Sequence, residues 1–244
     1  MGDIFIFLTD PGPASFFNFS FLPKYAYYFL QGVAYTLLLS VASVLLAIIP
    51  ALALALMRLS KNRLVSSISG AYIAIFRSTP LLVQLSVIYF GLFYIIQVPP
   101  VLFLGFIPLD KFVPFVVALA INSSSYVAEI FRAGILAVDI GQTEAARSLG
   151  LNSFKAMRLV VLPQAIKNIL PAIANEVVTM VKESAVCSAY GMMELMWAAK
   201  TVAGSTHISI GPYIFVALIY FCINYPAGKA IEALERRMRR GDRR

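Results

Sequence analysis

Few side chains in this sequence could perform covalent chemistry. The only histidine is His207, and the two cysteines, Cys187 and Cys222, are too few for a disulfide framework or a metal cluster. No nucleophile and base occur at a plausible spacing, and no G-x-x-x-x-G-K-S/T loop is present to bind nucleotide phosphates. The sequence therefore predicts a protein that is not an enzyme, with no catalytic residue, no metal site and no cofactor of its own.

The polar residues that could act on a solute lie inside long apolar runs. Glu176, Thr179 and Glu183 are three and four residues apart, so a helix places them on one face. An ionisable side chain inside a bilayer is costly unless it is paired or faces water, so this face should line a solute path or a helix interface. We hypothesise that a solute path is lined by Ser78, Thr79, Gln84, Asn122, Ser125, Glu176, Thr179 and Glu183.

Other interpretations of these residues stay open. Small hydroxyl residues such as Ser125 also allow helices to pack closely in a membrane. Glu176 could be a structural acid that is bonded to a neighbouring helix. Pro80, if it lies inside a helix, would free backbone carbonyls that could bind the ammonium group of a solute.

The composition indicates a membrane protein. The mean hydropathy is +0.82 and only 13% of the residues are charged, about half the share in soluble domains. Several apolar runs reach the roughly 20 residues that a helix needs to cross a bilayer, and only helices or closed barrels can satisfy their backbone there. We expect an all-α integral membrane protein with five spans, at 25–57, 71–96, 112–131, 163–187 and 212–230.

The basic residues orient these spans. Three lie in the first loop, four in the third loop and six in the tail, whereas the opposite side has only Lys24, Lys111 and Lys200. Since basic residues are retained on the cytoplasmic side, the N-terminus should lie outside and the C-terminus inside. The net charge of +8 then reflects this bias, and no nucleic-acid partner is needed to explain it.

Three charged residues fall near the predicted inner ends of the spans. Glu129 and Arg132 are three residues apart, so they would share a helix face as an ion pair. Arg77 would lie near the inner end of the second span. There its side chain could reach the headgroups or pair with an acid of another helix.

The third loop, 134–162, has local structure of its own. Asp139 followed by Gln142 is typical of a capping box, and Gly150 suits the left-handed position that ends a helix. Asn152 can then cap a second helix. The small residues Ala145 and Ala146 would let the surface of another protein come close. From these features alone, a solvated loop and a docking element are both open.

The spacing in this loop resembles the cytoplasmic signature of ABC importer permeases. Glu144-Ala145-Ala146 is followed after three residues by Gly150, and Val160 and Leu162-Pro163 complete the pattern. The segments 76–84 (FRSTPLLVQ), 126–135 (YVAEIFRAGI), 162–165 (LPQA) and 181–185 (VKESA) resemble the permeases of the polar amino acid uptake group. The resemblance implies one permease domain, 1–244, with the type I importer fold. It also implies that the ATPase-coupling residues are Glu144, Ala145, Ala146, Arg147 and Gly150.

The resemblance further implies a function and a set of partners. The chain would be the membrane-spanning subunit of an ATP-driven importer in the bacterial inner membrane, taking an amino acid from an extracellular solute-binding protein. Two separate ABC ATPase subunits would bind the ATP, and a second permease copy or a paralogue would complete the path. The alternative is a self-contained channel or an ion- or proton-coupled secondary transporter. Such transporters often contain internal repeats, which this chain lacks, and this alternative leaves the signature in the third loop unexplained.

Overall fold

The computed structural model describes residues 17–239, apart from 104 and 106. The end of the basic tail, which carries Arg240, Arg243 and Arg244, lies outside the described residues. The helices are α2 (Leu22–Arg58), α3 (Arg63–Ser78), α4 (Leu81–Val87), α5 (Phe93–Ile95), α6 (Leu109–Leu136), α7 (Ile140–Ser148), α8 (Ser153–Ala156), α9 (Leu162–Glu183), α10 (Leu195–Thr206) and α11 (Gly211–Arg239). Shorter elements are the π-turns η1 (Ile88–Leu92) and η2 (Met157–Val161), the 3₁₀ helix η3 (Ser184–Tyr190), and the strands β1 (Leu102–Phe103) and β2 (Ile107–Pro108), which pair antiparallel.

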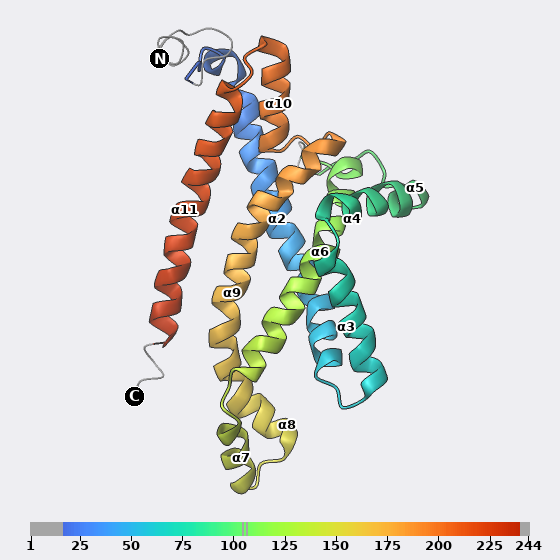
Figure 1. The fold of residues 1–244 in the computed structure, drawn as a ribbon, viewed down its shortest axis with the longest axis vertical. Coiled ribbons are helices and arrows are strands. Elements are labelled where there is room, and N and C mark those ends of the chain that lie inside the picture. The colour runs from blue at the N-terminus through green and yellow to red at the C-terminus, as the bar shows by residue number, and fades with distance from the viewer. Residues whose placement is uncertain (1–16, 104, 106, 240–244) are drawn as a thin grey trace, which may run out of the picture.

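The core of the molecule is the packing of α2 against α6. Three alanines of α2, Ala47, Ala51 and Ala55, have no exposed surface, and such small residues let helix backbones approach closely in a membrane. Larger side chains fill the space nearer the other end of the pair, including Leu39 of α2 and Leu119 of α6. Figure 1 shows α9 beside this pair, with α11 along its outer side.

Four described helices or continuous helical segments are long and apolar enough to cross a membrane, namely α2, α6, the segment Ser153–Tyr190 that contains α9, and α11. The fifth expected span, at 71–96, is not a single helix. It is a pair of helical segments, Arg63–Ser78 and Leu81–Ile95, bent by 111° at a short break. The predicted second span is therefore corrected to a broken one, and it begins earlier, because Asn62 caps α3 by accepting from Leu64 N and Val65 N.

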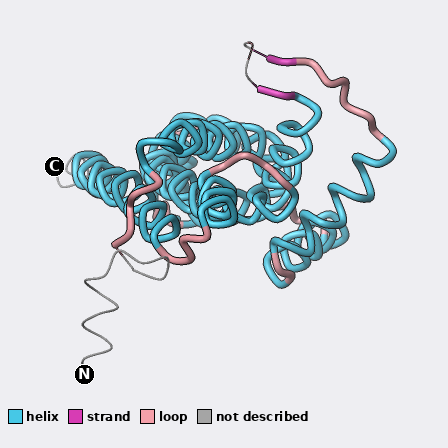
Figure 2. Tube along the Cα trace, turned by 90° about the horizontal axis from the view of Figure 1, so that it is seen from above, coloured by secondary structure: helices cyan, strands magenta, loops and turns pink. Residues whose placement is uncertain are grey.

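The break has a local cause in Pro80. A proline disfavours helical backbone in the residue before it, and Thr79 is accordingly extended, with φ −114° and ψ 146°. The chain leaves α3 sideways, and Figure 1 shows α4 and α5 running outward from its end. Figure 2, from above, shows the segment from α4 to β2 looping away from the main group of helices.

The break also changes the position of Arg77. This residue lies in the last turn of α3, about 21 Å along the helix from Arg63 at 1.5 Å per residue. Because α3 begins at Arg63 rather than at residue 71, Arg77 lies in the last turn of the helix and not near the beginning of the span, where the predicted bounds placed it. Its guanidinium lies 5.4 Å from the ring centroid of Tyr126 of α6.

Three of the other helices, α2, α6 and α11, extend beyond the predicted spans, whereas α9 ends before residue 187. α6 starts at Leu109, directly after Pro108, and continues to Leu136. α9 ends at Glu183, where the chain tightens into the 3₁₀ helix η3 rather than continuing as α-helix. α11 continues to Arg239, and Glu232 forms ion pairs with Lys229 and Arg236 on its last turns. Pairs at these spacings support a helix that has left the apolar region.

Candidate coupling loop and solute path

The third loop is a pair of short helices joined by a glycine turn, as the sequence predicts. Asp139 caps α7 by accepting from Gly141 N at 2.7 Å. Gly150 has φ +86°, and the bonds from Gly150 N to Arg147 O and from Leu151 N to Ala146 O form the helix-ending motif that favours glycine. The second helix is capped by the side chain of Asn152, as expected.

One detail of the predicted cap differs. In a capping box the side chain of Gln142 would bond back to the cap residue. Here the Gln142 side chain instead accepts from Gln164 Nε2 at 3.4 Å, which links α7 to the start of α9. Gln164 Nε2 also donates to Val160 O at 2.9 Å. The loop is thereby tied to the base of α9.

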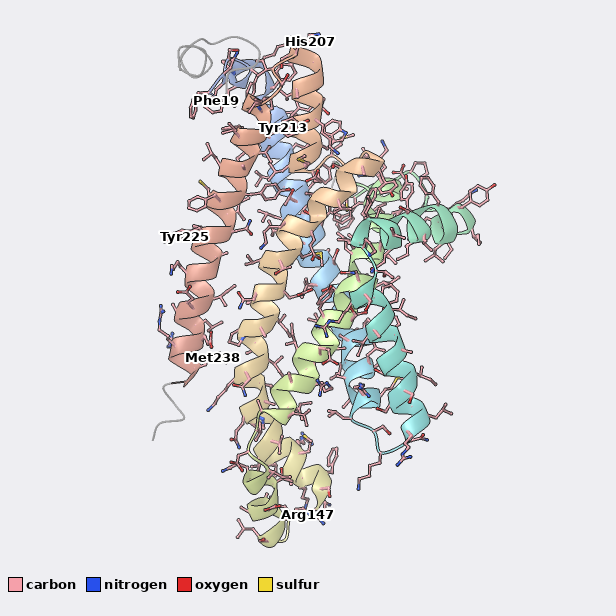
Figure 3. All side chains as sticks on the ribbon, viewed as in Figure 1. Phe19, Arg147, His207, Tyr213, Tyr225 and Met238 are labelled. Carbon is pink, nitrogen blue, oxygen red and sulfur yellow. The ribbon has the colours of Figure 1, made fainter. Side chains whose placement is uncertain are left out.

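The predicted coupling residues do not all face outward. Glu144, Ala145, Arg147 and Gly150 are exposed, but Ala146 is buried, with only 4% of its surface accessible. Ala146 cannot offer a close approach to a partner, because the two short helices pack against each other at this point. Figure 3 shows Arg147 at the tip of the molecule, at the end opposite to His207.

The tip of the loop also exposes large apolar side chains. Leu149 is 85% exposed and Phe154 is 71% exposed, on either side of the Gly150 turn. Exposed apolar side chains beside charged ones are typical of a protein–protein contact. The sequence pattern placed Phe154 on one face of the second helix with Met157 and Val161, and it assigned the close approach of a partner to the small alanines.

The segment 153–190 joins the loop to a membrane span without a break. α8, the π-turn η2, α9 and the 3₁₀ helix η3 form one continuous helical stretch. A displacement of the loop would therefore be transmitted along α9, because hydrogen-bonded helix does not stretch. This is the arrangement that mechanical coupling requires.

Several predicted path residues meet at the break between α3 and α4. The buried Gln84 donates from Nε2 to Thr79 Oγ1 at 2.8 Å, and it also lies 2.8 Å from Phe76 O and 2.9 Å from Thr79 O. Its Oε1 accepts from Asn122 Nδ2 of α6 at 2.7 Å. We call Thr79, Gln84 and Asn122 the break cluster. Gln84 donates to the backbone carbonyls that Pro80 leaves without a helical partner. In this structure these carbonyls are therefore already hydrogen-bonded, and they are not open to the ammonium group of a solute.

Glu176 belongs to a different part of the predicted path. Its Oε1 accepts from Ser123 Oγ at 2.8 Å, and both residues are buried between α6 and α9. Ser125 bonds to its own helix, at Asn122 O. The residues Thr179 and Glu183 follow Glu176 on α9. The predicted path residues thus meet α6 at two places. Gln84 of α4 is bonded to Asn122, and Glu176 of α9 is bonded to Ser123.

Sequence reasoning missed one buried acid, Glu194. It has no exposed surface, caps α10 by accepting from Met196 N and Trp197 N, and accepts from Tyr220 Oη at 3.2 Å. Leu195 N in turn donates to Thr36 Oγ1 of α2. Glu194 therefore ties α10 to α11, beside α2. A lone glutamate in a loop gives no signal of burial, because the burial comes from distant helices.

Burial raises the pKa of Glu194 to about 7, although its three hydrogen bonds and the nearby Lys200 act in the opposite direction. Between about pH 4.5 and pH 7 the folded protein holds a proton that the unfolded chain has released. The free energy of unfolding should therefore fall as the pH rises through this window, by up to about 3 kcal/mol from this group. Thermal unfolding at pH 5 and pH 8 should show a smaller pH dependence in Glu194→Gln than in the wild type. The exposed Glu232→Gln is the matched control, and an equal pH dependence in all three proteins would contradict the prediction.

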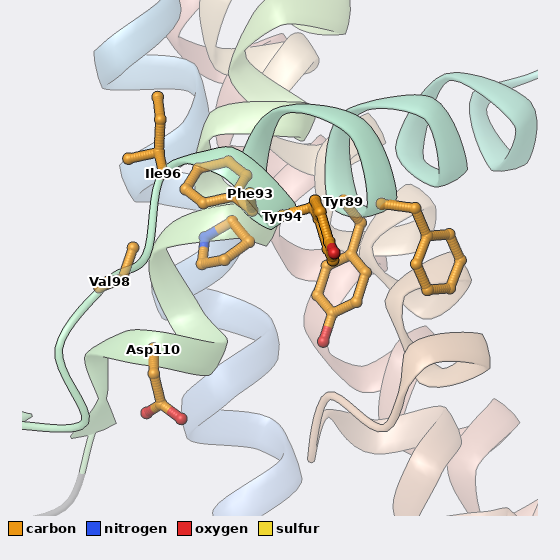
Figure 4. Close-up of a pocket in the computed structure, with 8 residues that line it drawn as sticks. Tyr89, Phe93, Tyr94, Ile96, Val98 and Asp110 are labelled. Atoms are coloured by element: carbon orange, nitrogen blue, oxygen red, sulfur yellow. The ribbon is translucent and has the colours of Figure 1, made fainter.

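A small pocket of about 240 Å³ lies under the outward-running segment. Figure 4 shows Tyr89, Phe93 and Tyr94 of this segment together with Asp110 of α6. The ring of Tyr89 stacks on Phe115 at a centroid distance of 5.3 Å. This contact fixes the root of the segment on α6.

The family described as binding-protein-dependent transport system inner membrane component matches residues 43–240. The chain therefore belongs to this family, whose members are the membrane-spanning permease subunits of ATP-driven ABC importers. The predicted class, the type I importer fold and the absence of an enzymatic role are confirmed by this membership. Permeases of this class work with separate ATPase subunits and a solute-binding protein.

Individual relatives agree with this assignment. The arginine transport system permease protein ArtQ of Bacillus subtilis is 42% identical over 188 residues, which cover 77% of this chain and 82% of that protein. The nopaline transport system permease protein NocM of Agrobacterium fabrum is 38% identical over 181 residues, or 74% of this chain and 75% of that one. A solved amino acid ABC transporter with histidines is 44% identical, with a TM-score of 0.79 over 88% of this chain and 96% of that one.

Proposed function

We propose that this chain moves an amino acid across the bacterial inner membrane as part of an ABC importer. The observation that carries this proposal is the likeness, at 44% identity and over 96% of the other chain, to a solved amino acid ABC transporter. The relatives named for arginine and nopaline transport support the same class of solute. Which amino acid is carried depends largely on the solute-binding protein in importers of this kind.

The assembly would contain two permeases and two ATPase subunits. The second permease is another copy of this chain or a paralogue, and the ATPases dock on the loop that carries Glu144, Ala145, Arg147 and Gly150. The exposed Leu149 and Phe154 add apolar area to this contact. The continuous helical segment from the loop into α9 supports the transfer of ATPase movement to the membrane.

The N-terminus would lie outside and the C-terminus in the cytoplasm. This topology is supported by the basic residues of the first loop, the third loop and the tail, which outnumber those on the other side. Five spans, with the bent pair counted as one, agree with termini on opposite sides. The loop at 134–162 is then cytoplasmic, where the ATPases are.

The solute path would run beside α6. Polar side chains in a membrane helix are favoured where they face a path or one another. The residues proposed to line it are Ser78, Thr79, Gln84, Asn122, Ser125, Glu176, Thr179 and Glu183. The hydrogen bonds of the break cluster and of the Ser123–Glu176 pair hold four of these side chains in fixed positions, which supports selective contact with a solute: Thr79, Gln84, Asn122 and Glu176.

Reconstitution tests this proposal. Proteoliposomes that contain the permease and its ATPase, with the solute-binding protein outside, should accumulate a labelled amino acid. They should do so only when ATP is enclosed in the vesicles, on the side of the ATPases. Ionophores that collapse ion gradients should leave the initial rate unchanged, because ATP supplies the energy. A permease carrying an ATPase-docking defect serves as the control. Accumulation that needs an ion gradient and proceeds without ATP would favour a secondary transporter and contradict the proposal.

A further inference from the structure

A second polar space lies between α3 and α6, beside the end of α2. It has a volume of about 460 Å³ and is lined by Arg58, Gly70, Ile73, Ala74, Arg77, Ser78, Glu129 and Arg132. We call it the arginine pocket. It contains three guanidinium groups and one carboxylate, so it carries a net charge of two positive units. Only Ser78 belongs to the solute path proposed above.

Of the three arginines of the pocket, Arg132 forms an ion pair with the one carboxylate. Arg132 binds Glu129 through Nε at 3.0 Å and Nη2 at 2.8 Å, which confirms the ion pair expected from their spacing. Arg58 donates instead to the neutral hydroxyl of Ser66, at 2.9 Å. Within residues 17–239 as described, Arg58 and Arg77 form no ion pair with a carboxylate. The pocket therefore has two positive charges in excess of its one carboxylate, Glu129.

Such a pocket is suited to an oxyanion. A guanidinium at membrane depth needs water or an anion, and the ring of Tyr126 supports the charge of Arg77 without neutralising it. The planar guanidinium group binds carboxylates and phosphates through two parallel hydrogen bonds. The small side chains of Gly70 and Ala74 leave room for such a group beside Arg77.

The two faces of α3 indicate where the anion comes from. Gly70, Ala74 and Arg77 recur at helical spacing on the face of the pocket, whereas the exposed Ile68 and Ile75 lie on the opposite side. A lipid headgroup site needs exposed apolar side chains next to it to receive the acyl chains. The face of α3 that offers them points away from the pocket, which favours an anion that arrives through water.

The arginine pocket also continues the proposed path. Along α3 it extends from Gly70 to Ser78, about 12 Å at 1.5 Å per residue. Ser78 adjoins Thr79 of the break cluster, and Arg58 at the other end is the last residue of α2, where the first loop begins. A solute that leaves the break cluster toward this loop would pass Arg77 first and Arg58 afterwards.

We propose that the arginine pocket is an exit site, which receives the carboxylate of the transported amino acid before it is released from the permease. This inference rests on the proposed function. Arg77 and Arg58 supply guanidinium groups that form no ion pair within the described residues, while Glu129 binds Arg132 and limits the attraction, so that the solute can leave. An exit site should also bind the same amino acid from the side of release, and this binding should slow further uptake.

The test measures uptake by the assembled importer in proteoliposomes, using the amino acid that the wild type accumulates. The same amino acid, enclosed in the vesicles as the probe, should slow uptake, and its α-carboxamide should not. Arg77→Gln and Arg58→Gln should each raise the internal concentration for half-inhibition by about tenfold, since each removes a charge-assisted hydrogen bond. Arg63→Gln loses the same charge at the first residue of α3, outside the pocket, and should match the wild type.

Three results would overturn the exit site. One is equal inhibition by the amino acid and its carboxamide in the wild type, a comparison that needs no variant to fold. Another is normal uptake with the same half-inhibition in Arg77→Gln and Arg58→Gln. The third is inhibition that depends on both arginines only in phosphatidylglycerol vesicles and not in phosphatidylcholine, which would assign the pocket to a lipid phosphate. Failure of the wild type to take up any amino acid would overturn the proposed function as well.

Discussion

Replacing Gly150 by valine, or Ala145 by tryptophan, should abolish the stimulation of ATP hydrolysis by loaded solute-binding protein. Gly150 has φ +86°, a conformation that is strained for a β-branched residue by about 1–3 kcal/mol, so valine should unwind the turn between α7 and α8. Ala145 is exposed on α7, and a tryptophan there would hold the ATPase away from the loop. ATP hydrolysis by the assembled complex, with and without the loaded binding protein, measures both effects.

The controls separate docking from folding. Space around Gly150 is open, so the backbone conformation alone decides the outcome, and Gly150→Asn should retain most of the stimulation because asparagine tolerates positive φ. Ala145→Ser keeps the residue small and should behave as the wild type. Both disruptive variants should still enter the membrane in normal amounts. Full stimulation in Gly150→Val and Ala145→Trp would contradict the docking role of this loop.

The parts of the fold that follow from local sequence could be predicted. The long apolar runs predicted the membrane helices, and the capping residues Asp139 and Asn152 predicted both helices of the third loop. These signals act over a few residues, so they can be seen without the tertiary structure. The ion pair of Glu129 and Arg132 belongs to the same class, because a three-residue spacing on a helix brings the two groups together.

The parts that depend on contacts between distant segments could not be predicted. A proline in an apolar run usually indicates a kink, but at Pro80 the chain turns by 111°. Gln84 donates to the carbonyls that the turn exposes, and Asn122 of α6 donates to Gln84. Ala146 is turned inward because α7 packs on the next helical segment. Glu194 is buried by helices remote in sequence. In each case the partner is set by the tertiary fold and not by the spacing of neighbouring residues.

The division of the polar residues around α6 gives the last prediction, which concerns Glu176. This buried acid accepts a hydrogen bond from Ser123 at 2.8 Å, and Thr179 lies three residues further along α9. If Glu176 contacts the solute, Glu176→Gln should change the KM for uptake about tenfold or alter the preference among amino acids, because a charge is lost at the contact. The amount of assembled complex should stay normal, since glutamine keeps an oxygen that can accept from Ser123.

A purely structural acid would behave differently under the same changes. Glutamine preserves the bond from Ser123, so transport by Glu176→Gln would be normal in KM and preference. Ser123→Ala would instead remove the bond and lower the thermal stability, because a buried acceptor left without a partner costs about 1–3 kcal/mol. Thr179→Val, which keeps the shape and removes the hydroxyl, tests the next position on α9. If Glu176→Gln and Thr179→Val both transport with unchanged KM and preference, the α9 side carries no solute, and the path must be assigned to the break cluster on the α4 side.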